Sequence, residues 1–268
     1  MRNREFTRHG YLWVPTRRDL LKATGGAVAA GLLTPRIARA AFAPVVSTAK
    51  GSVGGTGVTT SAMDTTGSTL LVAAFMNYAS VTGGAVSDSV GGQSNTWTLL
   101  TTQVSSTLRL RLFYCIGPTH AGSGHTFTGA SDFGPDYCDI AVMAFSAVSP
   151  AFDLQSGNFS NSANSIQPGT ITPRWTAELL VTATAGSISG TTAGVNSGFG
   201  APIGVAPDGS HHFGLYMSSL IQTAIIPENP TWTWTGALTT PCAVAAAFKY
   251  SGSAAPSGQI HHRVTGGY

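Results

Sequence analysis

The chain has 268 residues, of which 43% are hydrophobic and only 9% carry a formal charge. Its net charge of +3 comes from residues 1–40, which hold eight of the basic and two of the acidic residues; the rest of the chain has six basic and nine acidic residues, a net charge of −3. Nucleic-acid binders and proteins that dock on anionic lipid need clustered Lys and Arg. This balance therefore excludes both classes.

The first forty residues have the order of a signal peptide. A basic segment with Arg17 and Arg18 precedes a short Ala/Gly/Leu run at 23–33, and Ala38-Arg39-Ala40 supplies a small-residue cleavage site. The arginine pair followed by Leu-Leu-Lys resembles the twin-arginine signal, which the export machinery reads. The apolar run is shorter than the roughly 20 residues of a membrane span. We therefore expect a mature chain with no membrane span, located in the periplasm, secreted or at the cell surface.

Short apolar or alternating runs, rich in Val, Thr and aromatic residues and bounded by Gly, Ser, Asn and Pro, follow the signal. This composition and spacing are typical of strands in a sandwich or barrel, and no helical stripe of useful length occurs among them. The sequence therefore predicts an all-β fold, a two-sheet antiparallel β-sandwich. Its strands are expected at residues 69–75, 96–101, 108–116, 125–129, 138–145, 178–183, 213–221, 231–236 and 242–250.

Four segments of the first half return in the same order in the second half, 103 to 109 residues later. The repeated pairs are 70–74 with 179–183, 112–115 with 215–218, 127–130 with 234–237 and 141–145 with 244–248. We expect one domain over residues 41–250, made of two related halves at about 47–148 and 170–250, with a flexible tail at 251–268. One domain is favoured over two because each half offers only four or five expected strands, too thin a core to fold alone.

Several strand and turn signatures resemble jelly-roll-like sandwich domains of bacterial secreted and surface proteins. The signatures are Thr69-Leu-Leu-Val, Asp88-Ser with Asn95-Thr-Trp-Thr, Leu112-Phe-Tyr, His125-Thr-Phe-Thr and Ala247-Phe-Lys, which together span about residues 47–250. The resemblance implies a jelly-roll-like fold. Such domains are usually treated as binding or adhesive modules, so the resemblance implies that role by analogy, although its motifs are strand and turn signatures and none is catalytic.

Catalytic and metal-binding patterns are weak. The G-x-S-x-G turn of serine hydrolases is absent. The histidines lack the spacing of a zinc site, so no metal ligands are predicted. Glycosidases use two carboxylates, but Glu178 and Glu228, the only glutamates after the signal, favour strand-edge and loop roles. No catalytic residue is predicted, and a secreted hydrolase or lyase acting on a polysaccharide or another polymer, through carboxylates or a dispersed triad, stays the alternative.

Four residues are candidates for ligand binding. Trp97 and Trp175 stand nearer to expected loops than the other tryptophans, so their rings are free to stack on the apolar face of a sugar. Asp88 and Asn95, with nearby carbonyls, suit a calcium ion, although turn chemistry explains both equally well. No other cofactor is expected. The chain is thus predicted to be an exported, non-catalytic binding, adhesive or surface-structural module whose partner is a neutral polysaccharide or surface polymer.

The three cysteines allow one disulfide. Cys138 and Cys242 begin corresponding strands of the two halves, so a bridge between them would join the halves. A bridge from Cys115 to Cys138 is equally open, because connectivity cannot be deduced from sequence. An exported protein meets oxidising conditions, but three buried thiols remain the plain alternative.

Overall fold

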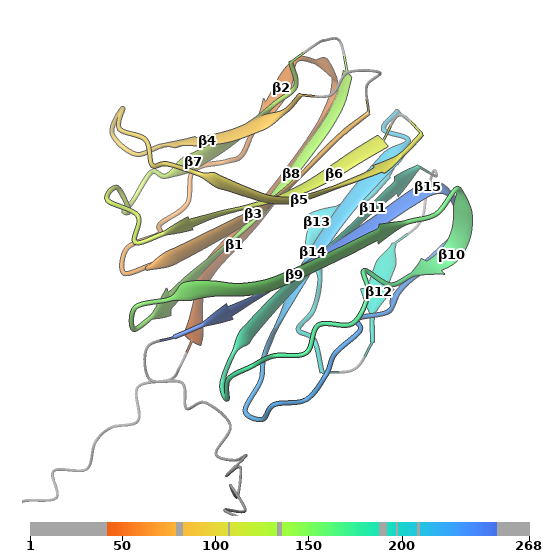
Figure 1. Ribbon diagram of the computed structural model, residues 1–268. Helices are drawn as coiled ribbons and strands as arrows, with labels where there is room; N and C mark the ends of the chain where they lie inside the picture. The colour runs from red at the N-terminus through yellow and green to blue at the C-terminus, as the bar shows by residue number, and fades with distance from the viewer. Residues whose placement is uncertain are drawn as a thin grey trace, which may run out of the picture. The chain divides into compact units, whose positions relative to one another are not determined.

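The computed structural model describes residues 42–78, 83–106, 108–132, 136–187, 192–196, 198–207 and 210–250. The predicted export signal, with Arg17, Arg18, Ala38 and Ala40, and the predicted tail lie outside these ranges. The described residues form antiparallel strands and no helix, which confirms the all-β prediction (Figure 1), and they contain no helix able to cross a membrane. The strands are β1 Phe42–Gly55, β2 Gly57–Thr59, β3 Leu70–Tyr78, β4 Ala85–Ser89, β5 Thr98–Ser105, β6 Leu108–Ile116, β7 Thr126–Ala130, β8 Asp136–Ala147, β9 Ala151–Phe159, β10 Ser162–Ile166, β11 Leu179–Ser187, β12 Ala193–Val195, β13 Ile203–Val205, β14 Phe213–Ile221 and β15 Trp232–Lys249.

The two halves have matching strand orders. In the first half, a large sheet has the order β1-β8-β3-β6-β5 and a small sheet has the order β2-β7-β4. In the second half, β9-β15-β11-β14-β13 repeats the large sheet position by position. The first part of the long strand β15 pairs with β10 and β12, and so takes the place of β7. Each half therefore has the strand order of a jelly roll.

The register also corresponds between the halves. Leu70 lies opposite Phe145 in the first half, and Leu179 lies opposite Phe248 in the second. The β6–β14 match differs from the sequence alignment, because Ala74 pairs with Leu112 whereas Ala183 pairs with Met217. The structural partner of Leu112 is thus displaced by two residues from the expected one. A shift of two keeps the same strand face.

The two large sheets face each other around a central core. Alternate residues of β3 and β11, at 70, 72, 74 and 76 and at 179, 181, 183 and 185, point into it. The other face of β3, with Leu71, Ala73 and Phe75, is also buried, because the small sheet β2-β7-β4 covers it. In Figure 1 this small sheet lies to the upper left of β3 and β6, away from the second half. Burial on both faces explains why the central strands read as continuous apolar runs.

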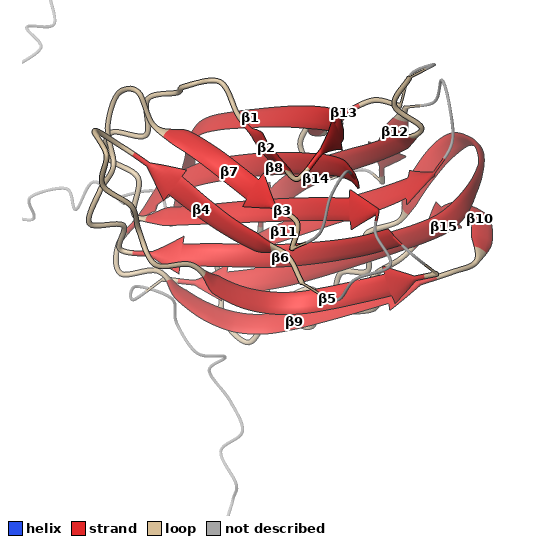
Figure 2. Cartoon of the chain, turned by 90° about the horizontal axis from the view of Figure 1, so that it is seen from above, coloured by secondary structure: helices blue, strands red, loops and turns tan. Residues whose placement is uncertain are grey.

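The edges of the large sheets meet at two seams. Strand β5 lies beside β9 along one seam, and β1 lies beside β13 along the other (Figure 2). Strand β1 corresponds to β9, and β5 corresponds to β13. Exchanging the two halves therefore turns the β5–β9 seam into the β13–β1 seam, as a twofold relation between the halves requires. The first half contributes eight strands and the second seven, so the expectation of four or five in each was too low. The unpredicted strands are β1, β2 and β4 in the first half and β9, β10, β12 and β13 in the second, and β9 and β10 lie before residue 170, where the second half was expected to begin.

Neither of the two possible disulfides, Cys138 to Cys242 or Cys115 to Cys138, is formed. All three cysteines are buried thiols, and Cys138 lies in the outer cluster under β2-β7-β4 whereas Cys242 lies in the central core. The register gives the reason. Phe145 and Phe248 correspond at an offset of 103, so Cys138 and Cys242 are one residue out of step and point to opposite faces. Burial raises the pKa of Cys115 to about 11 and that of Cys242 to about 12, which keeps both thiols unreactive.

Candidate functional site

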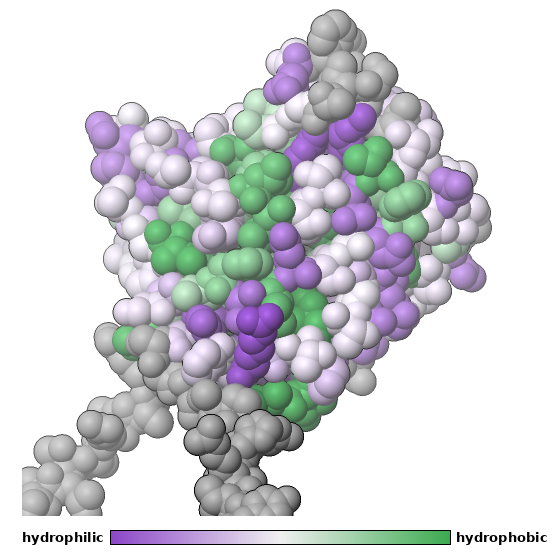
Figure 3. Space-filling view, viewed as in Figure 1, coloured by the Kyte–Doolittle hydropathy of each residue, from purple (hydrophilic) through white to green (hydrophobic). Residues whose placement is uncertain are grey.

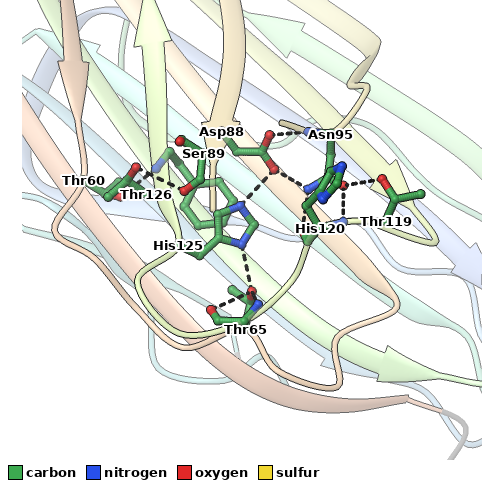
Figure 4. Close-up of polar contacts among 11 residues, drawn as sticks. Thr60, Thr65, Asp88, Ser89, Asn95, Thr119, His120, His125 and Thr126 are labelled. Atoms are coloured by element: carbon green, nitrogen blue, oxygen red, sulfur yellow. Dashed lines mark hydrogen bonds and ion pairs between the residues drawn. The ribbon is translucent and has the colours of Figure 1, made fainter. Parts of the chain in front are cut away.

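A buried polar network in the first half contains two of the predicted residues (Figure 4). His125, just before β7, contacts Asp88 of β4 through Nε2, at 2.9 Å from Oδ2, and Thr65 through Nδ1, at 2.8 Å from Oγ1. Thr65 and His125 are fully buried. Burial alone would raise the pKa of Asp88, but hydrogen bonds from His125 and Asn95 outweigh it and lower that pKa.

The predicted pair Asp88 and Asn95 does come together. The Asn95 backbone N–H donates to Asp88 Oδ1 at 2.7 Å, and Asn95 Nδ2 donates to Asp88 Oδ2 at 2.6 Å and to the carbonyl of His120 at 2.7 Å. The His120 N–H in turn donates to Asn95 Oδ1 at 2.9 Å. Both carboxylate oxygens of Asp88 therefore accept N–H groups, and a calcium ion at this place would have to replace those donors.

Thr65, His125 and Asp88 have the residue types of a nucleophile–base–acid triad, but their contacts and burial indicate a role in holding the fold together. The Thr65 hydroxyl already accepts the backbone N–H of Gly122 at 3.0 Å, besides its contact with His125. A nucleophile must reach a substrate, and this one is sealed in the protein. The network joins the segments that precede β3, follow β4 and precede β7.

A second Asp–His pair lies at the β1–β13 seam. Asp139 of β8 is fully buried, and its Oδ1 lies 2.7 Å from Nε2 of His211, which precedes β14. Burial raises the pKa of Asp139 to about 6, although His211 lowers it. A groove of about 330 Å³, lined by Lys50, Ser52 and His211 among others, opens beside the pair. Gly51 of β1 is required here, because a Cβ on it would come within 2.6 Å of Asp139 Oδ1.

A groove of about 740 Å³ lies on the second half. It runs between β9 and the segment that leads into β11. Trp175, half-buried, forms part of its wall, and Lys249 of β15 places its Nζ 4.7 Å from the centre of the indole ring. The lining residues are Leu154, Gln155, Thr170, Ile171, Thr172, Pro173, Arg174 and Trp175.

A β-bulge in β9 lies next to the groove-lining residue Leu154. Phe152 of β9 pairs with Phe248, and Leu154 pairs with Ala247, so Asp153 is an extra residue without a partner in the ladder. Phe152 packs on the central core, whereas Leu154 packs on the outer face of the large sheet. Bulges of this kind re-orient side chains and are common beside functional sites.

Asp153 contacts Glu178, which lies just before β11. Glu178 is fully buried, its Oε1 accepts the backbone N–H groups of Arg174 at 3.1 Å and Trp175 at 2.9 Å, and its carboxyl lies within hydrogen-bond reach of that of Asp153. Burial, and next the negative charge of Asp153, raise the pKa of Glu178 to about 7, while the two backbone N–H groups oppose the shift. The pair lies beneath the wall of the groove.

The first half has the same bulge without the acids. Val45 is the extra residue of β1 between the pairs Pro44–Phe145 and Val46–Ala144, so it corresponds to Asp153. Thr69, the residue before β3, corresponds to Glu178 and bonds to the backbone of Ala147. The carboxyl pair is therefore particular to the second half and is not required by the fold.

The structure separates the other predicted candidates. Trp175 lines the groove, whereas Trp97 packs on the outer cluster, its ring edge-on to Phe127 with centroids 6.1 Å apart. The sequence reasoning gave Glu178 an edge or turn role and did not single out Asp153. An acid between the apolar residues Phe152 and Leu154 was the only signal for it, and the bulge that gives it meaning is invisible in the sequence.

Within the described ranges, no group of three or more His, Cys, Asp or Glu residues is arranged to hold a metal ion. Comparison with protein-family models, with curated proteins and with solved structures finds no match for this chain. The structure is all-β and compatible with the β-sandwich that the resemblance noted above implies. A relation to bacterial secreted proteins stays a prediction.

Proposed function

We propose that the chain is an exported, non-catalytic binding module whose ligand site is the groove beside Trp175. Its ligand is a neutral polymer, such as a polysaccharide, at the cell surface or in the periplasm. The observation that carries this proposal is the groove itself, in which an aromatic wall is held in place by Lys249 on its ring and by Glu178 on its backbone N–H group. A pre-formed wall lowers the entropic cost of binding.

The lining suits a neutral ligand. Leu154, Ile171 and Trp175 offer apolar surface, while Gln155, Thr170 and Thr172 offer hydrogen-bonding groups for hydroxyls. Arg174 is the only charged residue of the lining. In Figure 3 the visible face mixes residues of intermediate and apolar hydropathy with smaller hydrophilic clusters.

Replacing Trp175 with Ala is expected to weaken retention on the polymer by about 1–3 kcal/mol, because the aromatic wall of the groove is lost. Affinity electrophoresis or pull-down against a panel of neutral polysaccharides measures the loss. Trp97→Ala is the matched control, since Trp97 packs on the outer cluster and its loss should lower stability but not retention. Equal retention by Trp175→Ala and the parent would contradict the assignment of the site.

A hydrolase or lyase is the second candidate, and the carboxyl pair is the observation that favours it. Glycosidases use two carboxyls, one of them with a raised pKa, and Glu178 has such a pKa, about 7. Glycosidase carboxyls stand roughly 5–9.5 Å apart on either side of the bond that is cleaved, whereas Asp153 and Glu178 lie within hydrogen-bond reach of each other. Release of soluble product by the parent protein, lost about 10²-fold or more in Glu178→Gln, would establish the enzyme and reject the binding module.

Export is tested separately. Changing Arg17 and Arg18 together to Lys should leave unprocessed precursor in the cytoplasm, because the receptor reads the arginine pair. Immunoblotting of cell fractions measures the result. Normal maturation of the double variant would remove the localisation from the proposal.

A further inference from the structure

Two buried carboxyl oxygens under the groove need a hydrogen-bond donor. Asp153 Oδ2 and Glu178 Oε2 are both buried, and neither finds a donor in the described part of the chain. The two carboxyl groups nevertheless lie within hydrogen-bond reach of each other. Ionised carboxylates only accept hydrogen bonds, so the contact requires a proton on one of the two groups.

The same glutamate also holds the wall of the groove. Its Oε1 accepts the N–H groups of Arg174 and Trp175, and these two residues line the groove. One side chain thus connects the shared proton to the backbone that carries the indole ring. If the pair becomes doubly negative, the repulsion acts on the group that anchors Trp175.

We propose that the proton shared by Asp153 and Glu178 is a latch that keeps the 172–178 segment closed, so that the groove loses its ligand when the pair is deprotonated. This inference rests on the proposed function for its ligand-binding consequence. The closure of the segment is a property of the protein alone, and it can be measured without any ligand.

The charged groups around the pair are few. Arg174 lies in the 172–178 segment and is exposed, and Lys249 on β15 contacts the Trp175 ring. On the side of β14, Gln222 donates its backbone N–H to the Glu178 carbonyl and its side-chain amide to Glu228 at 3.2 Å. None of these residues donates to the buried oxygens of the pair in the described structure. A proton held between the two carboxyls would therefore supply the hydrogen bond that these buried oxygens lack.

The direction of the pH effect follows from linkage. Because the pKa of Glu178 is raised to about 7 in the folded protein, the folded state keeps a proton that the unfolded chain would release. The stability that this proton supplies is complete below the ordinary pKa of Glu, 4.5, and is lost as the pH rises through about 7. The latch is thus closed in acid and opens toward alkaline pH.

The test is amide hydrogen exchange of residues 172–178 in the mature protein between about pH 5.5 and about pH 8.5, with polymer retention measured over the same range. Protection in the parent, relative to Glu178→Gln at each pH, should fall by up to tenfold per pH unit as the pH rises toward about 7, because in this range the folded state holds a proton that the opened segment releases, and it should level off above about 7. Retention should fall with it. Gln keeps the acceptor for the two N–H groups and donates to Asp153, so this variant should stay closed throughout.

Two further variants make the test specific. Asp153→Asn also removes the repulsion and should behave like Glu178→Gln, which covers the case that one of them does not fold. Glu228→Gln makes the same charge change nearby without contacting the pair, and it should keep the pH dependence of the parent. Loss of that dependence in Glu228→Gln would overturn the assignment to this pair.

The outcomes separate the two proposals. The latch would be overturned, and the binding function left standing, by either of two results. One is amide protection of residues 172–178 in the parent that equals that of Glu178→Gln at every pH. The other is polymer retention by the parent that does not change with pH. A pH-dependent protection with no polymer retained at any pH supports the latch but rejects the proposed function.

Discussion

Residues 41–148 expressed alone are expected not to fold as a soluble monomer. Eleven described side chains of this half, among them Leu70, Leu110 and Phe145, belong to the central core that the second half covers. Exposing each large apolar side chain costs about 1.5–3 kcal/mol. The total exceeds the 5–15 kcal/mol by which a typical domain is stable. The small sheet β2-β7-β4 covers only the opposite face and does not replace this loss.

Size-exclusion chromatography and chemical denaturation of the fragment measure this result, with the mature chain from residue 41 as the control. The fragment should aggregate, or unfold without a cooperative transition. Adding residues 149–250 during refolding should restore a cooperative transition, because the missing face is supplied in trans. A monomeric fragment that unfolds cooperatively would show that the halves are two tandem domains.

His125→Ala is expected to lower the free energy of unfolding by about 3–5 kcal/mol near neutral pH. The change removes the imidazole that contacts Asp88 and Thr65, and it leaves the buried Asp88 carboxylate without one of its donors. Urea denaturation measures the loss. Because the pKa of Asp88 is lowered in the folded state, its contribution is present above the ordinary value of 3.8 and is lost as the pH falls below it. The parent and the variant should therefore converge in stability in acid.

His120→Ala is the matched control for this network. His120 takes part through its backbone N–H and carbonyl, which Asn95 binds, and these groups survive the substitution. We expect a change of about 0.5 kcal/mol or less, as for an ordinary partly exposed position. A loss below about 1 kcal/mol in His125→Ala, or equal losses in both variants, would show that the buried network does not stabilise the fold.

Much of the fold followed from local patterns. Alternation and turn residues predicted the strands around Leu70, Leu108 and Leu179, and the recurrence of these runs predicted two related halves in one antiparallel sandwich. Seven strands were missed. Strands β2, β4, β10, β12 and β13 have only three to five residues and carry little periodicity. Strands β1 and β9 have 14 and nine residues, but they lie at the edges of the large sheets and are not apolar runs. Without them, the burial of both faces of β3 and β11 had no explanation.

Strand register is the second feature that could not be predicted from the sequence. The sequence matched Cys138 to Cys242, but pairing shows that they are one residue out of step, which places them on opposite faces. A single-residue offset cannot be read from the sequence, because it depends on the bulges and ladders that form between strands distant along the chain.

The candidate site divides in the same way. The sequence by itself identified Trp175 as the ring nearest a loop, paired Asp88 with Asn95, and indicated an all-β chain with little charge. Only the tertiary structure decided that Asp88 belongs to a sealed network, that Trp97 packs on the outer cluster, and that Asp153 meets Glu178. The reason is physical: local composition specifies which strands form, whereas a bulge in one strand and the burial of another determine which distant carboxyls share a proton.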